Sequence, residues 1–143
     1  IQSKKKFKYV VKNFPNTEYA LDSKFKLDLI EEMLASKEMF IAKHYLKKEK
    51  WIPAINRLKY IVTEHETTIY VEEALFRLVE IYYMLGLIDE SKKYASVLGY
   101  NYQSSEWYEE SYRILNKNYK NPQDKIKQQK KSKVLKKIKS ILD

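Results

Sequence analysis

The sequence predicts an all-α fold, an α-solenoid of stacked antiparallel helix pairs, and three observations lead to this prediction. The first is a shortage of turn residues, because the 143 residues include only two glycines and three prolines. A β-rich domain would need such residues about every ten positions. Residues 16–52 contain neither type, which is typical of long helices joined by short polar turns.

The second observation is an internal repeat, in which five positions recur 37 residues later with unchanged spacing. The first set comprises Ala42, Tyr45, Trp51, Ala54 and Leu58, and the second comprises Val79, Tyr82, Ile88, Ser91 and Ala95. Tetratricopeptide repeats, with a period of about 34 residues, place small residues where paired helices approach closely and bulky residues between successive pairs. The spacing therefore predicts a tetratricopeptide-repeat superhelix. Residues 3–15 match the second half of an earlier repeat.

The third observation is a seven-residue hydrophobic period. Ala20, Leu27, Leu34 and Ile41 recur at this spacing without a break in phase, which predicts one long helix from about residue 17 to residue 48. Roughly 17 residues are inserted here beyond one repeat. At about 1.5 Å per residue they lengthen the helix by on the order of 25 Å, which is unusual in such repeats.

The sequence also indicates where the helices begin and end. The expected helices cover residues 2–14, 17–48, 51–65, 69–85, 87–99 and 105–118. Asn16 is placed to cap the long helix, and Ser104 or Ser105 to cap the last one. Gly86 and Gly99 each suit the left-handed turn that ends a helix.

Residues 1–118 are expected to form the repeat array, and residues 119–143 a basic, lysine-rich tail. Of the net charge of +9, residues 123–143 carry +6. One helical stripe of the tail is apolar: Val134, Ile138 and Ile141. Three interpretations remain open for the tail, namely a solvated segment, contact with an anionic membrane surface, and nucleic-acid binding. The last is disfavoured because residues 123–143 contain no aromatic residue and no arginine, so no nucleic-acid partner is expected.

No arrangement of residues supports catalysis or cofactor binding. The chain contains no cysteine and two histidines, and we expect His44 and His65 to be surface residues rather than metal ligands. Adjacent acidic pairs such as Glu31–Glu32 diverge by about 100° on a helix. Two isolated glycines cannot form a phosphate-binding loop, and no apolar run approaches the roughly 20 residues that span a membrane. The prediction is a protein that is not an enzyme, without catalytic, cofactor-binding or metal-ligating residues.

Three aromatic residues fall outside the repeat pattern: Tyr83, Trp107 and Tyr108. Two interpretations remain open, since either they cover the end of the superhelix or they anchor a partner, a role in which Tyr and Trp are enriched. In such arrays the first helix of each pair lines a concave groove. By register, that groove is expected to include Met39, Lys43, Leu46, Phe76, Glu80 and Tyr83.

Four segments carry a resemblance to a known family: FPNTEYA (14–20), KEMFIAKHYLKKEKWIPAINRL (37–58), EEALFRLVEIYYMLGLIDE (72–90) and GYNYQSSEWY (99–108). The sequence resembles the BamD family, the outer-membrane assembly lipoproteins of Gram-negative bacteria, over about residues 3–115, the C-terminal part of that family's repeat array. The resemblance implies a scaffold on the periplasmic face of the outer membrane, anchored in the full-length protein by an N-terminal lipidated cysteine. Glu49 departs from the family, in which a turn glycine is usual.

The resemblance also implies partners. In that family the C-terminal repeats dock on a periplasmic POTRA domain of the barrel-forming subunit BamA, within the machine that folds and inserts β-barrel proteins. Other assembly lipoproteins and unfolded outer-membrane protein substrates are further expected partners. By local match, Asn56 and Arg57 fall on the family's Asn-Arg pair near the docking surface, and we extend the prediction to four further residues. The expected partner-binding residues are Asn56, Arg57, Tyr83, Trp107, Tyr108 and Arg113. The alternative is a tetratricopeptide adaptor of another complex.

Overall fold

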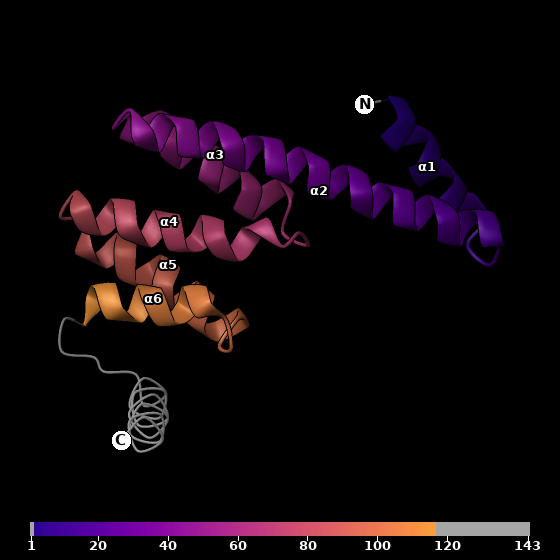
Figure 1. The fold of residues 1–143 in the computed structure, drawn as a ribbon. Coiled ribbons are helices and arrows are strands. Elements are labelled where there is room, and N and C mark those ends of the chain that lie inside the picture. The colour runs from indigo at the N-terminus through magenta and orange to yellow at the C-terminus, as the bar shows by residue number, and fades with distance from the viewer. Residues whose placement is uncertain (1, 117–143) are drawn as a thin grey trace, which may run out of the picture.

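The computed structural model describes residues 2–116, and every regular element in this range is an α-helix (Figure 1). The helices are α1 (Gln2–Asn13), α2 (Glu18–Lys47), α3 (Trp51–Glu64), α4 (Tyr70–Met84), α5 (Ile88–Asn101) and α6 (Glu106–Leu115). Each begins and ends within three residues of its expected position, so the predicted all-α repeat fold is confirmed. The tail predicted for residues 119–143 lies outside the described residues.

Consecutive helices run antiparallel and pack side by side into a stack (Figure 1). The long helix α2 is accompanied by α1 along its N-terminal half and by α3 along its C-terminal half. The next helix, α4, packs against α2, α3, α5 and α6. Finally, α6 packs on α4 and α5 at the end of the described stack. This arrangement places α4 at the centre.

The core is centred on α4, whose buried residues are Val71, Ala74, Leu75, Phe76, Leu78, Val79, Ile81 and Tyr82. Small residues stand at the helix contacts, as the repeat pattern predicts: Ala42 of α2 and Ala54 of α3 are fully buried. Ser91 of α5 is also fully buried, and its hydroxyl donates to the carbonyl of Val79 at 2.9 Å. That bond satisfies the buried hydroxyl at this close contact.

The long helix forms as a single element but differs from its predicted pattern in two ways. Its N-cap is Thr17 rather than Asn16, because the Thr17 Oγ1 atom accepts a hydrogen bond from the Ala20 amide at 3.2 Å. Leu34, expected in the buried stripe, is 39% exposed, while Ala35 is fully buried. The stripe shifts because the N-terminal half of α2 faces α1, whereas the C-terminal half faces α3 and α4.

In the described part of the chain, left-handed backbone occurs at two turns. Gly86 has a φ of 76° after α4, as predicted, and Glu49 has a φ of 54° between α2 and α3. The prediction for Gly99 is wrong, because this residue lies inside α5, which continues to Asn101. A Cβ atom at Gly99 would lie 2.6 Å from the Tyr108 ring, so glycine here permits the close approach of α6.

Candidate docking surfaces

The structure places the six predicted partner-binding residues in three locations. Asn56 and Arg57 lie in a shallow hollow between α2 and α3. Tyr83 and Arg113 line a groove formed by α2, α3, α4 and α6. Trp107 and Tyr108 are partly buried in the packing of α6. The hollow and the groove share no lining residue, so they are two separate surfaces.

The hollow, which we call the Arg57 surface, is lined by Tyr45, Pro53, Asn56, Arg57 and Tyr60. Most of these residues come from α3, whose buried side is formed at helical spacing by Ala54, Leu58 and Ile61. The intervening polar residues are therefore turned away from the core. A proline is tolerated in the first turn of α3, because backbone N–H groups there have no partner within the helix.

An ion pair connects the Arg57 surface to α2. Arg57 donates from Nη1 to Oε2 of Glu38 at 2.9 Å. The Glu38 side chain is 15% exposed and the Arg57 side chain 45%, so the carboxylate is the enclosed partner. The hydrogen bond and the charge of Glu38 raise the pKa of Arg57 above its ordinary value. Glu38 was not predicted from the sequence, because the pair lies 19 residues apart on two helices.

The second surface, which we call the terminal groove, lies where α2 ends, α3 begins, and α4 and α6 end. It is lined by Leu46, Trp51, Arg77, Glu80, Ile81, Tyr83, Met84, Arg113 and Ile114. Both arginines are paired with acidic neighbours, since Arg77 contacts Glu80 at 2.7 Å and Arg113 contacts Glu110 at 2.7 Å. The groove therefore combines apolar walls with charges that are already matched.

Two aromatic residues of α6 are held against the core rather than in either surface. The ring centroid of Trp107 lies 5.2 Å from that of Phe76, and Tyr108 lies close to Gly99. Both positions fit the interpretation that these rings cover the end of the array. Phe76 and Met39, which the repeat register predicts in the concave groove, are only 6% and 2% exposed. That prediction is wrong for both residues, because they belong to the core packed between the helices.

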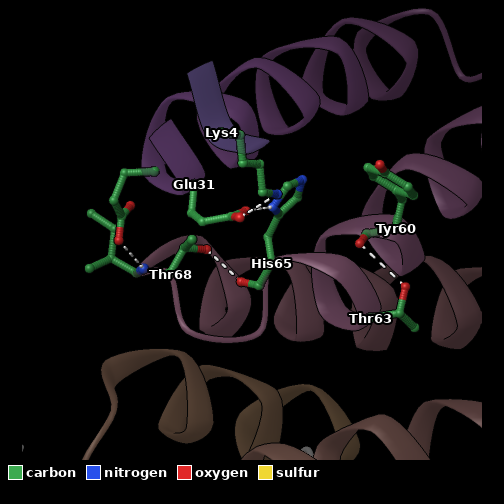
Figure 2. A network of polar contacts seen from close by, with 8 residues as sticks. Lys4, Glu31, Tyr60, Thr63, His65 and Thr68 are labelled. Atoms are coloured by element: carbon green, nitrogen blue, oxygen red, sulfur yellow. Dashed lines mark hydrogen bonds and ion pairs between the residues drawn. The ribbon is translucent and has the colours of Figure 1, made fainter. Parts of the chain in front are cut away.

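A polar junction holds α1 and the α3–α4 turn to the middle of α2. Figure 2 shows Glu31 of α2 between Lys4 of α1 and His65 at the end of α3. The Glu31 carboxylate forms an ion pair with Lys4 and a hydrogen bond of 2.8 Å with His65 Nδ1. His65 is only 4% exposed. The prediction of a surface histidine is wrong here, because Glu31 supplies a partner that allows the ring to be buried.

Two opposing effects set the pKa of Glu31. Burial alone would raise it, but the hydrogen bonds and charges of Lys4 and His65 outweigh burial and lower the pKa below its ordinary value. The folded junction therefore favours the carboxylate. The turn is fixed further by the Thr68 hydroxyl, which donates to the His65 carbonyl at 2.8 Å, and by Glu32, which accepts from the Ile69 amide at 3.1 Å.

The described residues show no sign of a metal site or of a membrane-spanning helix. Across residues 2–116, no group of three or more His, Asp or Glu side chains is placed to hold a metal ion. None of the helices in this range combines the length and the apolar character needed to cross a membrane. His44 of α2 is exposed, as predicted, with its ring centroid 6.3 Å from that of Tyr45.

Comparison with known proteins identifies one family. A family model described as an outer membrane lipoprotein, YfiO, matches residues 1–98. The chain is 54% identical over 119 residues to the outer membrane protein assembly factor BamD of Rickettsia prowazekii, covering 83% of this chain and 47% of that protein. It is 48% identical over 109 residues to the BamD of Caulobacter vibrioides, covering 76% of this chain and 36% of that protein. The chain thus spans less than half the length of these relatives.

Proposed function

The chain belongs to the YfiO family of outer membrane lipoproteins, and on this premise we propose that it is a non-catalytic scaffold of the machine that assembles β-barrel proteins in the outer membrane. The relatives described above are named outer membrane protein assembly factors. In this proposal the chain docks on a POTRA domain of BamA at the periplasmic face of the outer membrane, where lipid anchors the full-length protein. Other assembly lipoproteins and unfolded outer-membrane proteins are its further partners.

The observation that carries this proposal is the Arg57 surface. An arginine, an asparagine and two tyrosines meet there on a packed pair of helices, and Tyr and Arg are enriched at binding hot spots. Arg57 is held by Glu38 at 2.9 Å, and Tyr60 is 48% exposed. Both side chains are therefore presented by backbone that is already fixed, and a preformed surface lowers the entropic cost of association.

Binding of the periplasmic POTRA region of BamA to the full 143-residue chain tests the proposal. Arg57→Glu should weaken binding by about tenfold or more, because truncation at a hot spot has at least this effect and charge reversal removes every N–H donor as well. Isothermal titration calorimetry measures the affinity, and thermal unfolding shows whether the variant folds.

The matched control is Lys26→Glu, which makes the same change of charge on α2. Lys26 is also exposed and ion-paired, at 2.7 Å from Asp22, but it lies in the N-terminal half of the long helix. We expect this variant to bind as the wild-type chain does. A wild-type chain that does not bind the POTRA region, or equal weakening by both reversals, would contradict the proposal.

The terminal groove favours a second candidate function, that of a tetratricopeptide adaptor in another complex. Its lining combines Trp51, Ile81 and Tyr83 with paired charges, an arrangement that suits a peptide with large apolar side chains. Tyr83→Ala, measured against the same POTRA region, separates the two surfaces. Docking at the Arg57 surface predicts an unchanged affinity for this variant. If Tyr83→Ala weakens binding and Arg57→Glu does not, the POTRA region docks in the terminal groove instead.

A further inference from the structure

Glu38 stands behind the Arg57 surface and belongs to a different helix. Its Oε2 atom accepts from Arg57 Nη1 at 2.9 Å, and its side chain is 15% exposed. The adjoining residues of α2 fix its backbone, because Ala35, Met39 and Ala42 are buried in the packing of that helix. The carboxylate therefore has a rigid base, while the Arg57 side chain that it holds remains 45% exposed.

We propose that Glu38 is a positioning residue, which holds the guanidinium of Arg57 in the orientation that a docking partner engages. This inference rests on the proposed function. An arginine has five N–H donors, and the bond to Glu38 uses a donor on Nη1, so others are left for acceptor groups of a partner. Without Glu38 the long side chain would be ordered only on binding, and the rotamer freedom lost at that moment would weaken the complex.

The difference in enclosure separates this pair from an ordinary surface ion pair. Asp22 and Lys26, also on α2, lie 2.7 Å apart, but their side chains are 58% and 48% exposed. Both side chains of that pair are about half exposed, and such pairs contribute little to folding. In the Glu38–Arg57 pair one end is enclosed and the other faces the hollow that Tyr45 and Tyr60 help to line. A positioning residue must itself be held in place while the side chain that it orients stays accessible, and this pair meets both conditions.

Removal of the carboxylate should weaken binding without unfolding the chain. Glu38→Ala should reduce the affinity for the POTRA region about 2- to 10-fold, the effect expected when one additional side chain must be immobilised on binding. Glu38→Gln should have a smaller effect, because the amide oxygen can still accept from Arg57. The matched control is Asp22→Ala, which removes an acidic partner from the same helix and should leave the affinity unchanged. The midpoint of thermal unfolding should change little for Asp22→Ala, and the same measurement shows whether the two Glu38 variants are folded.

A double-mutant cycle distinguishes positioning from a general structural effect. If Glu38 acts through Arg57, Glu38→Ala should cause no further loss of affinity in a chain that already carries Arg57→Ala. An equal loss in both backgrounds would overturn the inference. Unchanged affinity in Glu38→Ala would also overturn the inference, because Glu38 would then play no part in binding. Higher affinity would overturn it too, because Glu38 would then compete with the partner for Arg57.

The same measurements separate this inference from the proposed function. If the wild-type chain binds and Arg57→Ala weakens binding while Glu38→Ala does not, the positioning role fails and the docking surface stands. If the wild-type chain does not bind the POTRA region, the proposed function fails, and the inference that rests on it fails as well.

Discussion

The two helices that differ most in how they are held are α1 and α4. No residue of α1 is buried, whereas eight residues of α4 are. In the described part of the stack, α1 packs against α2, while α4 packs against four other helices. What holds α1 includes a polar contact, the ion pair between Lys4 and Glu31. Apolar side chains in the N-terminal half of α2 are also left uncovered, since Tyr19, Leu21 and Phe25 are 79%, 74% and 63% exposed.

This difference shows that stability is distributed unevenly along the stack. In a solenoid each helix pair contacts only its neighbours, so one end can open while the rest remains folded. The residues that line the Arg57 surface and the terminal groove belong to α2, α3, α4 and α6, and none belongs to α1. We therefore expect changes in α4 to affect the whole fold, and changes around α1 to remain local.

The largest expected effect is that of Leu78→Ala in the centre of α4. Leu78 is fully buried, and a cavity at such a position costs about 2 to 5 kcal/mol of unfolding free energy. Val10→Ala in α1 is the matched truncation of a partly buried side chain and should cost less than about 1 kcal/mol. Urea unfolding followed by circular dichroism measures both values. Equal losses would show that the two helices are held alike.

An intermediate effect is expected at the polar junction. Glu31→Ala leaves the buried His65 without its partner, and an unsatisfied buried group costs about 1 to 3 kcal/mol. Hydrogen exchange should show faster exchange in α1 and in the α3–α4 turn, while α4 keeps its protection. Asp22→Ala, which removes an exposed acid from the same helix, should leave exchange unchanged. Uniform loss of protection across α1 and α4 would mean that the junction does not act locally.

The helices could be predicted from the sequence because their signals are local. Hydrophobic spacing and turn residues act within about ten positions, and they located all six helices of the described range. The errors arose where another element decides the outcome. Leu34 is exposed because α2 changes neighbours along its length. The glycine at position 99 serves the close approach of the Tyr108 ring of α6 rather than a helix-ending turn.

The candidate site was predicted less well, because its arrangement depends on contacts between distant residues. His65 stands between Glu64 and Glu66, which is typical of a surface histidine, and its partner Glu31 is 34 residues away. No local pattern indicates that pairing. Likewise, Arg57 and Tyr83 were recognised as separate residues, but only the stacking of the helices shows that they belong to two surfaces.

The smallest expected effect is a response of α1 to acid. Because the folded-state pKa of Glu31 lies below its ordinary value of 4.5, its carboxylate stabilises the junction above that pH, and this stabilisation is lost as the pH falls below it. Amide NMR spectra recorded from neutral pH to about pH 3.5 should show α1 loosening before α4 changes. Glu31→Gln has no group to titrate at this position, so its α1 signals should lose most of that response.

If the acid response of α1 persists in this variant, other carboxylates control the junction. If α1 and α4 respond together in the wild-type chain, the contrast between a loosely held helix and a densely packed one does not extend to acid.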